Sequence, residues 1–372
     1  MRVLFLSTPL ASHLYPMVPL AWALRAAGHD VLVGTTGPAL QVAGAGLHVI
    51  DFDPRRECAS VAQINAGRPD LVTARATRVA DGRPLLVEAT RRYADQMIAT
   101  AELCRPDLVV HSQLQGGGPL AAASLGVPAV EHGSSLLRTD DFYDRLPELI
   151  PETFAAHALD GLPRRAALDV APPSMVAEQP GAWPMRHIPY NGGGRLPEEL
   201  AGRPPGRRIA VTIGTSIMAP NMAPLLARVF EVAGDVDAEF AVLLSGVAGD
   251  AEHDAKVPPN VRIIRDWVPL RPLLDGCAGI VHHGGAGSTL AALDAGVPQL
   301  VVPSGAPNFL QSDSVRERGV GRTAEVGELD AALVEGVLDD AGIRAAVAEV
   351  RAEMAALPSP VQMVPRLAEL AA

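Results

Sequence analysis

The stretch HHGGAGSTLAALDAGVPQLVVP, from His282 to Pro303, is the strongest indicator of fold class in this chain. The apolar run just before it, Ala278 to Val281, predicts a buried strand. A turn with three glycines follows, and then an apolar-periodic stretch that predicts a helix. Strand, tight turn and helix in this order are typical of an α/β domain with a parallel sheet.

This turn has the composition of an anion site. Small residues let backbone N–H groups approach a ligand closely. The start of a helix adds unpaired N–H donors and about half a positive charge, which favours phosphate. His283 stands at the end of the strand and offers a titratable donor to the same place. The residues expected to surround a diphosphate here are His283, Gly285, Gly287, Ser288 and Thr289.

The first half of the chain alternates predicted strands and helices. Apolar runs predict strands at Val3–Leu6, His29–Val33, Leu47–Ile50, Asp107–Val110 and Val127–Val130. Helical patterns lie between them at Val18–Arg25 and Leu120–Leu125. Such alternation indicates βαβ units and a parallel sheet.

A Pro- and Gly-rich stretch from Pro172 to Pro205 separates the two halves and contains PYNGGG at Pro189–Gly194. The alternation then restarts, with strands expected at Ile209–Ile213, Phe240–Leu244, Val261–Ile264, Ala278–Val281 and Gln299–Val302, and helices at Ala223–Val232 and Gly342–Leu357. The predicted fold is α/β, with two Rossmann-like doubly wound domains that face a cleft. Ligands in such sheets bind at the carboxyl ends of the strands.

Composition excludes several classes of protein. The chain has 372 residues, a net charge of -11 and no basic run, so a nucleic-acid partner is not expected. No stretch of 18 uncharged apolar residues predicts a membrane span. The first residues read as a strand and not as a signal peptide, so we expect a cytoplasmic protein. The three widely spaced cysteines do not suggest a zinc site.

Three further segments carry polar or aromatic groups at predicted strand ends. VTIGTS places Thr215 and Ser216 after the first strand of the second half, as a second candidate diphosphate cradle. DWVPL places Trp267 and Val268 after another strand, where an indole face can stack on a nucleobase. STPLASHLYPM places His13 after the first strand, and a neutral imidazole suits a general base.

Taken together in this order, these motifs resemble the GT-B glycosyltransferases that decorate natural products with nucleotide-activated sugars, and in particular the actinomycete antibiotic branch. The resemblance spans nearly the whole chain. It implies an N-terminal acceptor-binding domain at residues 1–188, a linker at 189–206 and a nucleotide-sugar-binding domain at 207–356. The tail at 357–372 is similar to the family's last helix, which crosses back onto the N-terminal domain.

The resemblance also implies roles for single residues. His13 matches the base that takes a proton from the acceptor hydroxyl, and Trp267 and Val268 match the positions that hold the nucleobase. The diphosphate positions are Thr215, Ser216, His283, Gly285, Gly287, Ser288 and Thr289. A base on the face of the sugar opposite the leaving diphosphate gives inversion. Because N–H groups and a histidine can stabilise the departing charge, no metal and no cofactor beyond the dTDP-sugar co-substrate are expected.

Two departures from the family pattern bear on the chemistry. Many relatives place an Asp after the strand at Asp107–Val110 to orient the base, whereas this chain has His111, Ser112 and Gln113. Relatives often carry Asp-Gln where the matching residues of this chain are Pro307 and Asn308, which makes Asn308 the sugar-binding candidate. Loss of an acceptor for sugar hydroxyls favours a deoxygenated sugar delivered as a dTDP derivative.

The acceptor is expected to be a small hydrophobic natural product bound by the N-terminal domain, at loops such as Asn65–Pro84 and Ser134–Ile150. The acceptor-side candidates are Ser12, His111, His132 and Phe142. The Asp-X-Asp triplet at Asp51–Asp53 resembles a metal motif but lies far from the nucleotide residues, so no metal role is expected.

Two other functions stay open at this point. One is a sugar-nucleotide epimerase or hydrolase on the same fold, which would need carboxylates around the sugar. The other is a non-catalytic homologue that acts as an activator or partner. The oligomeric state is open as well, with a homodimer as the working expectation.

Overall fold

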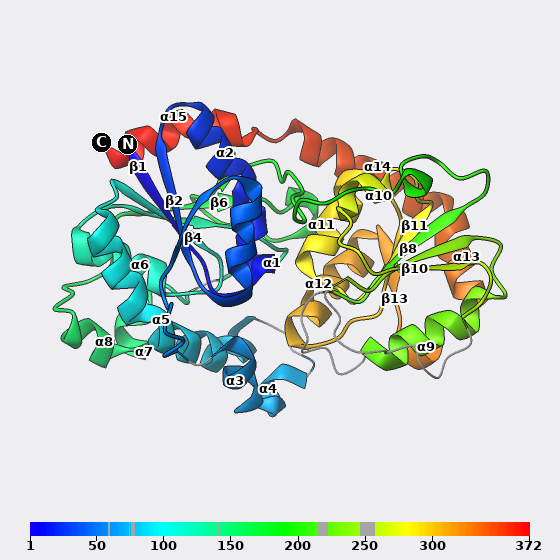
Figure 1. Ribbon diagram of the computed structural model, residues 1–372, viewed down its shortest axis with the longest axis horizontal. Helices are drawn as coiled ribbons and strands as arrows, with labels where there is room; N and C mark the ends of the chain where they lie inside the picture. Colours follow the sequence, from blue (N-terminus) through cyan, green and yellow to red (C-terminus); the bar gives the residue numbers. More distant parts are fainter. Residues whose placement is uncertain (59, 74, 76–78, 140, 215–221, 246–256) are drawn as a thin grey trace.

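The computed structural model describes residues 1–58, 60–73, 75, 79–139, 141–214, 222–245 and 257–372. Two parallel sheets lie side by side, each covered by helices (Figure 1). This is the predicted α/β fold with two doubly wound domains, and both domains have their strands in the order expected of Rossmann-like sheets.

The first sheet has seven strands in the order β3-β2-β1-β4-β5-β6-β7, and all of its pairings are parallel. The strands are β1 (Arg2–Leu6), β2 (Asp30–Thr35), β3 (His48–Asp51), β4 (Leu108–Ser112), β5 (Ala129–His132), β6 (Arg165–Asp169) and β7 (Trp183–Pro184). β4 and β5 are buried along their whole length, as strands covered on both faces must be.

Helices and short 3-10 turns connect these strands. They are α1 (Ala11–Leu14), η1 (Tyr15–Met17), α2 (Val18–Ala26), η2 (Gly37–Ala45), α3 (Val61–Ala66), α4 (Pro69–Thr73), η3 (Val79–Gly82), α5 (Arg83–Cys104), α6 (Gly117–Leu125), α7 (Leu146–Leu149), α8 (Pro151–Ala156) and η4 (Pro173–Met175). The long helix α5, which was not predicted from the sequence, packs against α6. Tyr93, Met97 and Ile98 form its buried stripe.

The second sheet has six strands in the order β10-β9-β8-β11-β12-β13, again all parallel. The strands are β8 (Arg208–Thr212), β9 (Glu239–Leu243), β10 (Val261–Ile264), β11 (Gly279–His282), β12 (Gln299–Val301) and β13 (Gly321–Thr323). The helices and turns of this half are α9 (Met222–Ala233), α10 (Leu270–Leu274), α11 (Ala286–Ala295), α12 (Ala306–Arg318), η6 (Val326–Glu328), α13 (Ala331–Asp339) and α14 (Ala341–Ala356).

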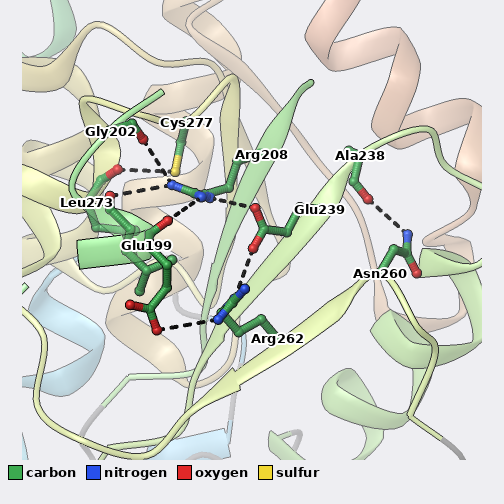
Figure 2. A network of polar contacts seen from close by, with 10 residues as sticks. Glu199, Gly202, Arg208, Ala238, Glu239, Asn260, Arg262, Leu273 and Cys277 are labelled. Atoms are coloured by element: carbon green, nitrogen blue, oxygen red, sulfur yellow. Dashed lines mark hydrogen bonds and ion pairs between the residues drawn. The ribbon is translucent and has the colours of Figure 1, made fainter. Parts of the chain in front are cut away.

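The connection between the sheets is fixed to the amino ends of β8 and β9. Buried Arg208 donates hydrogen bonds to the carbonyls of Glu199, in η5 (Glu198–Leu200), and Gly202, at 2.9 and 3.2 Å, and to the Glu239 carboxylate at 3.0 Å (Figure 2). Arg262 on β10 donates to the other oxygen of Glu239 at 3.1 Å. These contacts hold the end of the linker at the side of the sheet opposite the carboxyl ends of its strands.

The last helix, α15 (Pro360–Ala371), returns to the first domain, where it packs against α2. Arg366 on this helix lies over the ring of Trp183, with its guanidinium carbon 4.1 Å from the ring centroid. Both chain termini therefore lie on the first domain (Figure 1).

Most predicted strands and helices are present with bounds shifted by a few residues. The predicted strand at Val127–Val130 is β5, which begins at Ala129, and α15 in the C-terminal tail has Pro365 inside it. In the described part of the chain, no helix is long and apolar enough to cross a membrane.

Candidate functional site

The predicted donor side of the site lies where β8 and β11 are neighbours in the second sheet. On one side of this pair the strands follow the chain in the order β8, β9, β10, and on the other side in the order β11, β12, β13. The loops that leave the carboxyl ends of β8 and β11 therefore diverge. The loop after β8 contains Gly214, and the loop after β11 contains His283, Gly284 and Gly285. The glycine-rich turn that the sequence singled out thus stands at the usual ligand-binding crevice of this fold.

The imidazole of His283 lies against two glycines, one on each side, where a larger residue would not fit. A Cβ added at Gly214 would lie 2.6 Å from the ring, and one added at Gly285 would lie 2.4 Å from Nε2. The ring is largely buried, and its Nδ1 has no hydrogen-bond partner within the described residues. Burial lowers the pKa of His283 to about 4, so the ring is neutral at pH 7 and acts as a hydrogen-bond donor instead of a cation.

Helix α11 begins directly after this ring. Its N-cap residue, Gly285, makes no side-chain capping bond, so the first N–H groups of the helix are not taken by a cap. Ser288 is half-buried. The Thr289 hydroxyl donates to the Gly285 carbonyl at 3.1 Å, so this side chain stabilises the turn itself. The nearest group to a Cβ built at Gly287 would be the amide nitrogen of Asn191, at 3.8 Å.

The structure therefore gathers five of the predicted diphosphate residues, His283, Gly285, Gly287, Ser288 and Thr289, into one turn. Thr215 and Ser216, the other two, lie outside the described residues.

Trp267 follows β10 and contacts the linker. Its indole nitrogen donates to the Asn191 carbonyl at 2.8 Å. Cβ atoms built at Gly192 and Gly194 would lie 2.7 Å from the indole nitrogen and 2.6 Å from the Trp267 carbonyl. The glycines of PYNGGG are therefore needed for close packing on Trp267. Val268 is 5% exposed and packs into the core, which leaves only its backbone for a ligand.

Asn308 lies in the first turn of α12, beside the glycine-rich turn that begins at His283, which we call the donor turn. Its backbone carbonyl would be 3.0 Å from a Cβ at Gly284, and its side-chain amide donates to the Ser304 carbonyl. The amide is thus tied to its own helix start, and its oxygen is the group available to a sugar. Its sugar-binding role stays a prediction.

On the acceptor side, His13 stands in α1, just after the carboxyl end of β1. β1 and β4 are neighbours, so His13 occupies the corresponding crevice of the first sheet. Its Nδ1 lies 3.3 Å from the Thr8 hydroxyl, and burial lowers its pKa to about 4. Ser12, the neighbouring candidate, is exposed.

The residues at the carboxyl end of β4, where many relatives carry an Asp, make hydrogen bonds within the first domain. His111 is buried, and its Nδ1 lies 3.2 Å from the Ser112 carbonyl. The Ser7 hydroxyl donates to that of Ser112 at 3.2 Å, and the Gln113 amide donates to the Leu137 carbonyl at 2.9 Å. Among the side chains described, Thr8 is the one recorded in a hydrogen bond with the His13 ring. Thr8 was not among the predicted site residues, although it lies only five residues before His13 in the sequence.

Two other acceptor-side candidates, His132 and Phe142, are 0% and 2% exposed and lie in the interior of the first domain. An open cavity of about 760 Å³ lies elsewhere in that domain, between α3, η3 and α5. Its lining includes Ile64, Arg83 and Leu149, within or beside the two predicted acceptor loops, but none of the four acceptor-side candidates.

The Asp-X-Asp triplet has a structural explanation. Asp53 accepts hydrogen bonds from the backbone of Glu57 and Cys58 at 2.8 and 3.1 Å, and Asp51 pairs with Arg56 at 3.1 Å. Over the residues with described positions, no group of three or more His, Cys, Asp or Glu side chains could hold a metal ion.

The fold and this site define a class of protein, the GT-B glycosyltransferases, and comparison with known proteins agrees. The elloramycin glycosyltransferase ElmGT of Streptomyces olivaceus is 39% identical over 99% of this chain and 97% of its own length. The crystal structure of the glycosyltransferase SnogD from Streptomyces nogalater superposes with a TM-score of 0.85, at 38% identity over 100% of this chain and 99% of SnogD. The Streptomyces glycosyltransferase SsfS6, crystallised with thymidine diphosphate, has a TM-score of 0.80 and 28% identity over 99% of both chains.

The sequence also matches the two domain descriptions of one family. Residues 22–214 match the erythromycin biosynthesis protein CIII-like N-terminal domain, and residues 227–370 match the corresponding C-terminal domain. The chain belongs to this family of natural-product glycosyltransferases, and it is a nucleotide-sugar-dependent enzyme.

Proposed function

We propose that this glycosyltransferase moves a deoxysugar from a dTDP-sugar to a hydrophobic natural-product aglycone, with inversion and without a metal ion. The observation that carries the proposal is the His283 ring, held between Gly214 and Gly285 at the start of α11. The thymidine diphosphate complex of SsfS6 supports the choice of nucleotide.

The donor turn suits a departing diphosphate. As the bond between the anomeric carbon and the diphosphate breaks, negative charge grows on the phosphate oxygens. The N–H groups at the start of α11 and the neutral His283 ring are fixed in advance and can stabilise this charge. Such preorganised donors need no metal ion to act.

His13 supplies the base. When the Thr8 hydroxyl accepts the Nδ1 proton, Nε2 keeps a free lone pair for the proton of the acceptor hydroxyl. The acceptor oxygen then bonds to the anomeric carbon, and the diphosphate leaves from the opposite face. The transition state has oxocarbenium character, as in glycoside hydrolysis, and one displacement gives inversion.

The sugar pocket has one amide where relatives carry an acidic residue. Asn308 beside Gly284 is a weaker hydrogen-bond acceptor than a carboxylate, and Pro307 has no side-chain donor or acceptor. This pocket favours a sugar with fewer hydroxyls. The cavity between α3 and α5 is the proposed place for part of the aglycone.

Calorimetric titration with dTDP and UDP tests the proposal. We expect tight dTDP binding, weaker UDP binding and a loss of dTDP affinity in His283→Ala. His48→Ala, an exposed histidine of β3, is the control and should bind as the wild type does. Transfer should persist in EDTA, and NMR of the product should show the inverted anomer. Equal turnover of UDP-glucose would contradict the sugar assignment, and loss of transfer in EDTA would contradict the metal-free mechanism.

A further inference from the structure

The peptide groups of Gly284 are held on both sides. Its N–H donates to Nδ1 of His282 at 3.2 Å, and its carbonyl accepts from the Gln311 amide at 3.2 Å. Both partner side chains are buried, at 0% and 3% exposure. One comes from the last residue of β11 and the other from the middle of α12, so the turn is anchored to two different elements.

The hydrogen bonds also fix the protonation of His282. Because Gly284 donates to Nδ1, that nitrogen carries no proton, and the proton of the neutral ring lies on Nε2. Nε2 then donates to the side-chain oxygen of Gln299 at 3.0 Å. The hydrogen bonds therefore run in one direction, from the Gly284 N–H to His282 and from His282 to the side-chain oxygen of Gln299, which accepts, all within the buried interior. Burial keeps the ring neutral by lowering its pKa to about 3.

The turn needs such anchors because glycine does not choose a conformation by itself. Gly284 has a φ of +85°, which few other residues adopt. A Cβ there would lie 3.0 Å from the Asn308 carbonyl and 3.2 Å from Val301. The next residues, from Gly285 onward, carry the N–H groups of the donor site, so an error at Gly284 would displace all of them.

We propose that His282 and Gln311 are positioning residues that hold the Gly284 turn in the geometry needed to bind the donor's diphosphate. The inference rests on the proposed function, because it concerns the same donor site. Neither side chain needs to touch the nucleotide. Their effect should be confined to the phosphate end of the donor and should spare the nucleobase end, which Trp267 and the backbone of Val268 serve.

Comparison of dTDP with thymidine separates this role from general support of the fold. Thymidine has the nucleobase and sugar but no phosphate. Gln311→Leu and His282→Phe should each weaken dTDP binding roughly tenfold, since each leaves a buried backbone group of the turn unpaired. Thymidine binding, followed by ligand-observed NMR, should stay unchanged. Ser312→Ala is the matched control, because that buried hydroxyl donates only within its own helix, to the Phe309 carbonyl at 2.7 Å.

A rescue variant tests the hydrogen bond itself. In His282→Asn the side-chain oxygen can accept from the N–H two residues on, as in an Asx turn, so dTDP affinity should lie closer to wild type than in His282→Phe. Equal losses of dTDP and thymidine, or no loss in Gln311→Leu, would overturn the inference while leaving the proposed function intact. Failure of the wild type to bind dTDP would overturn both. Gln311→Leu keeps the test valid if His282→Phe does not fold.

Discussion

The indole nitrogen of Trp267 donates a hydrogen bond of 2.8 Å to the backbone carbonyl of Asn191. The preceding residue, Tyr190, packs edge-on against Tyr15 and Trp22 of the first domain, with ring centroids 5.1 and 5.2 Å apart. Two adjacent linker residues are thus held by opposite domains. Trp267, the predicted nucleobase residue, is thus joined through Asn191 and Tyr190 to the segment that follows His13.

Gly192 should be the sensitive glycine of the linker. Ala at this position would place its Cβ 2.7 Å from the indole nitrogen of Trp267, at a φ of +89°. We expect Gly192→Ala to displace the indole and lower dTDP affinity at least tenfold, or about 1.4 kcal/mol. Gly193→Ala has no neighbour within 4 Å of its Cβ and should bind dTDP normally in the same titration. Equal affinities of the two variants would show that the linker does not position Trp267.

The base should work over an unusually wide acidic range. Burial lowers the pKa of His13 to about 4, and in the proposed mechanism the neutral ring is the active form. The value of kcat/KM should therefore stay level from pH 8 to pH 5 and fall only as the pH approaches 4. Circular dichroism at each pH would confirm that the protein stays folded. An acidic limb with a midpoint near 6.5 would mean that His13 has an ordinary environment in the free enzyme.

Stability should fall in mild acid. Burial lowers the pKa values of His111, His132 and His187 to about 4 and that of His282 to about 3. The unfolded chain binds these protons below about pH 6.5, whereas the folded chain binds them only near pH 4 or 3. Each group therefore contributes stability that is complete above pH 6.5 and is lost as the pH falls, by up to about 1.4 kcal/mol per pH unit.

Urea unfolding at several pH values would measure this loss. His132→Asn should reduce the number of protons taken up on unfolding at pH 5 by about one, because one buried titrating ring is removed. An unchanged proton uptake would contradict a neutral, buried His132.

Arg208 should be a stability residue with no role in donor binding. Arg208→Met leaves the Glu239 carboxylate and the carbonyls of Glu199 and Gly202 without this partner, so we expect a loss of about 3–5 kcal/mol in the free energy of unfolding. Arg262→Met removes a guanidinium whose side chain is 47% exposed, and should cost less than about 1 kcal/mol. Folded Arg208→Met should still bind dTDP as the wild type does. A large loss of affinity would show that the linker anchor reaches the donor site.

The parallel sheets were predictable because their strands are buried on both faces and read as continuous apolar runs, as in Val3–Leu6 and Val109–Val110. The donor turn was predictable because its glycines and its helix start lie together in the sequence. Helix α5 was missed, since its buried residues are spaced among many charged ones. β7 was missed because two residues carry no periodicity, and β13 was missed because its three residues, Gly321–Thr323, do not form an apolar run.

Contacts between distant segments could not be predicted. PYNGGG was recognised as a domain boundary, but nothing in its composition says that its glycines pack on Trp267. In the same way, the sequence shows His282 only as a polar residue that follows the predicted strand Ala278–Val281, and Gln311 only as a polar residue in a segment with no predicted element. Their roles depend on where β11 and α12 meet in space.

The chain passes between the domains twice, and the two passages touch, because the Arg186 N–H donates to the Pro358 carbonyl at 2.7 Å. A protease cut in the linker would therefore not yield two separate domains. The C-terminal fragment would take with it α15, a helix packed against α2 of the N-terminal half. After such a cut, the N-terminal domain would be complete only while α15 of the C-terminal fragment stays packed on α2.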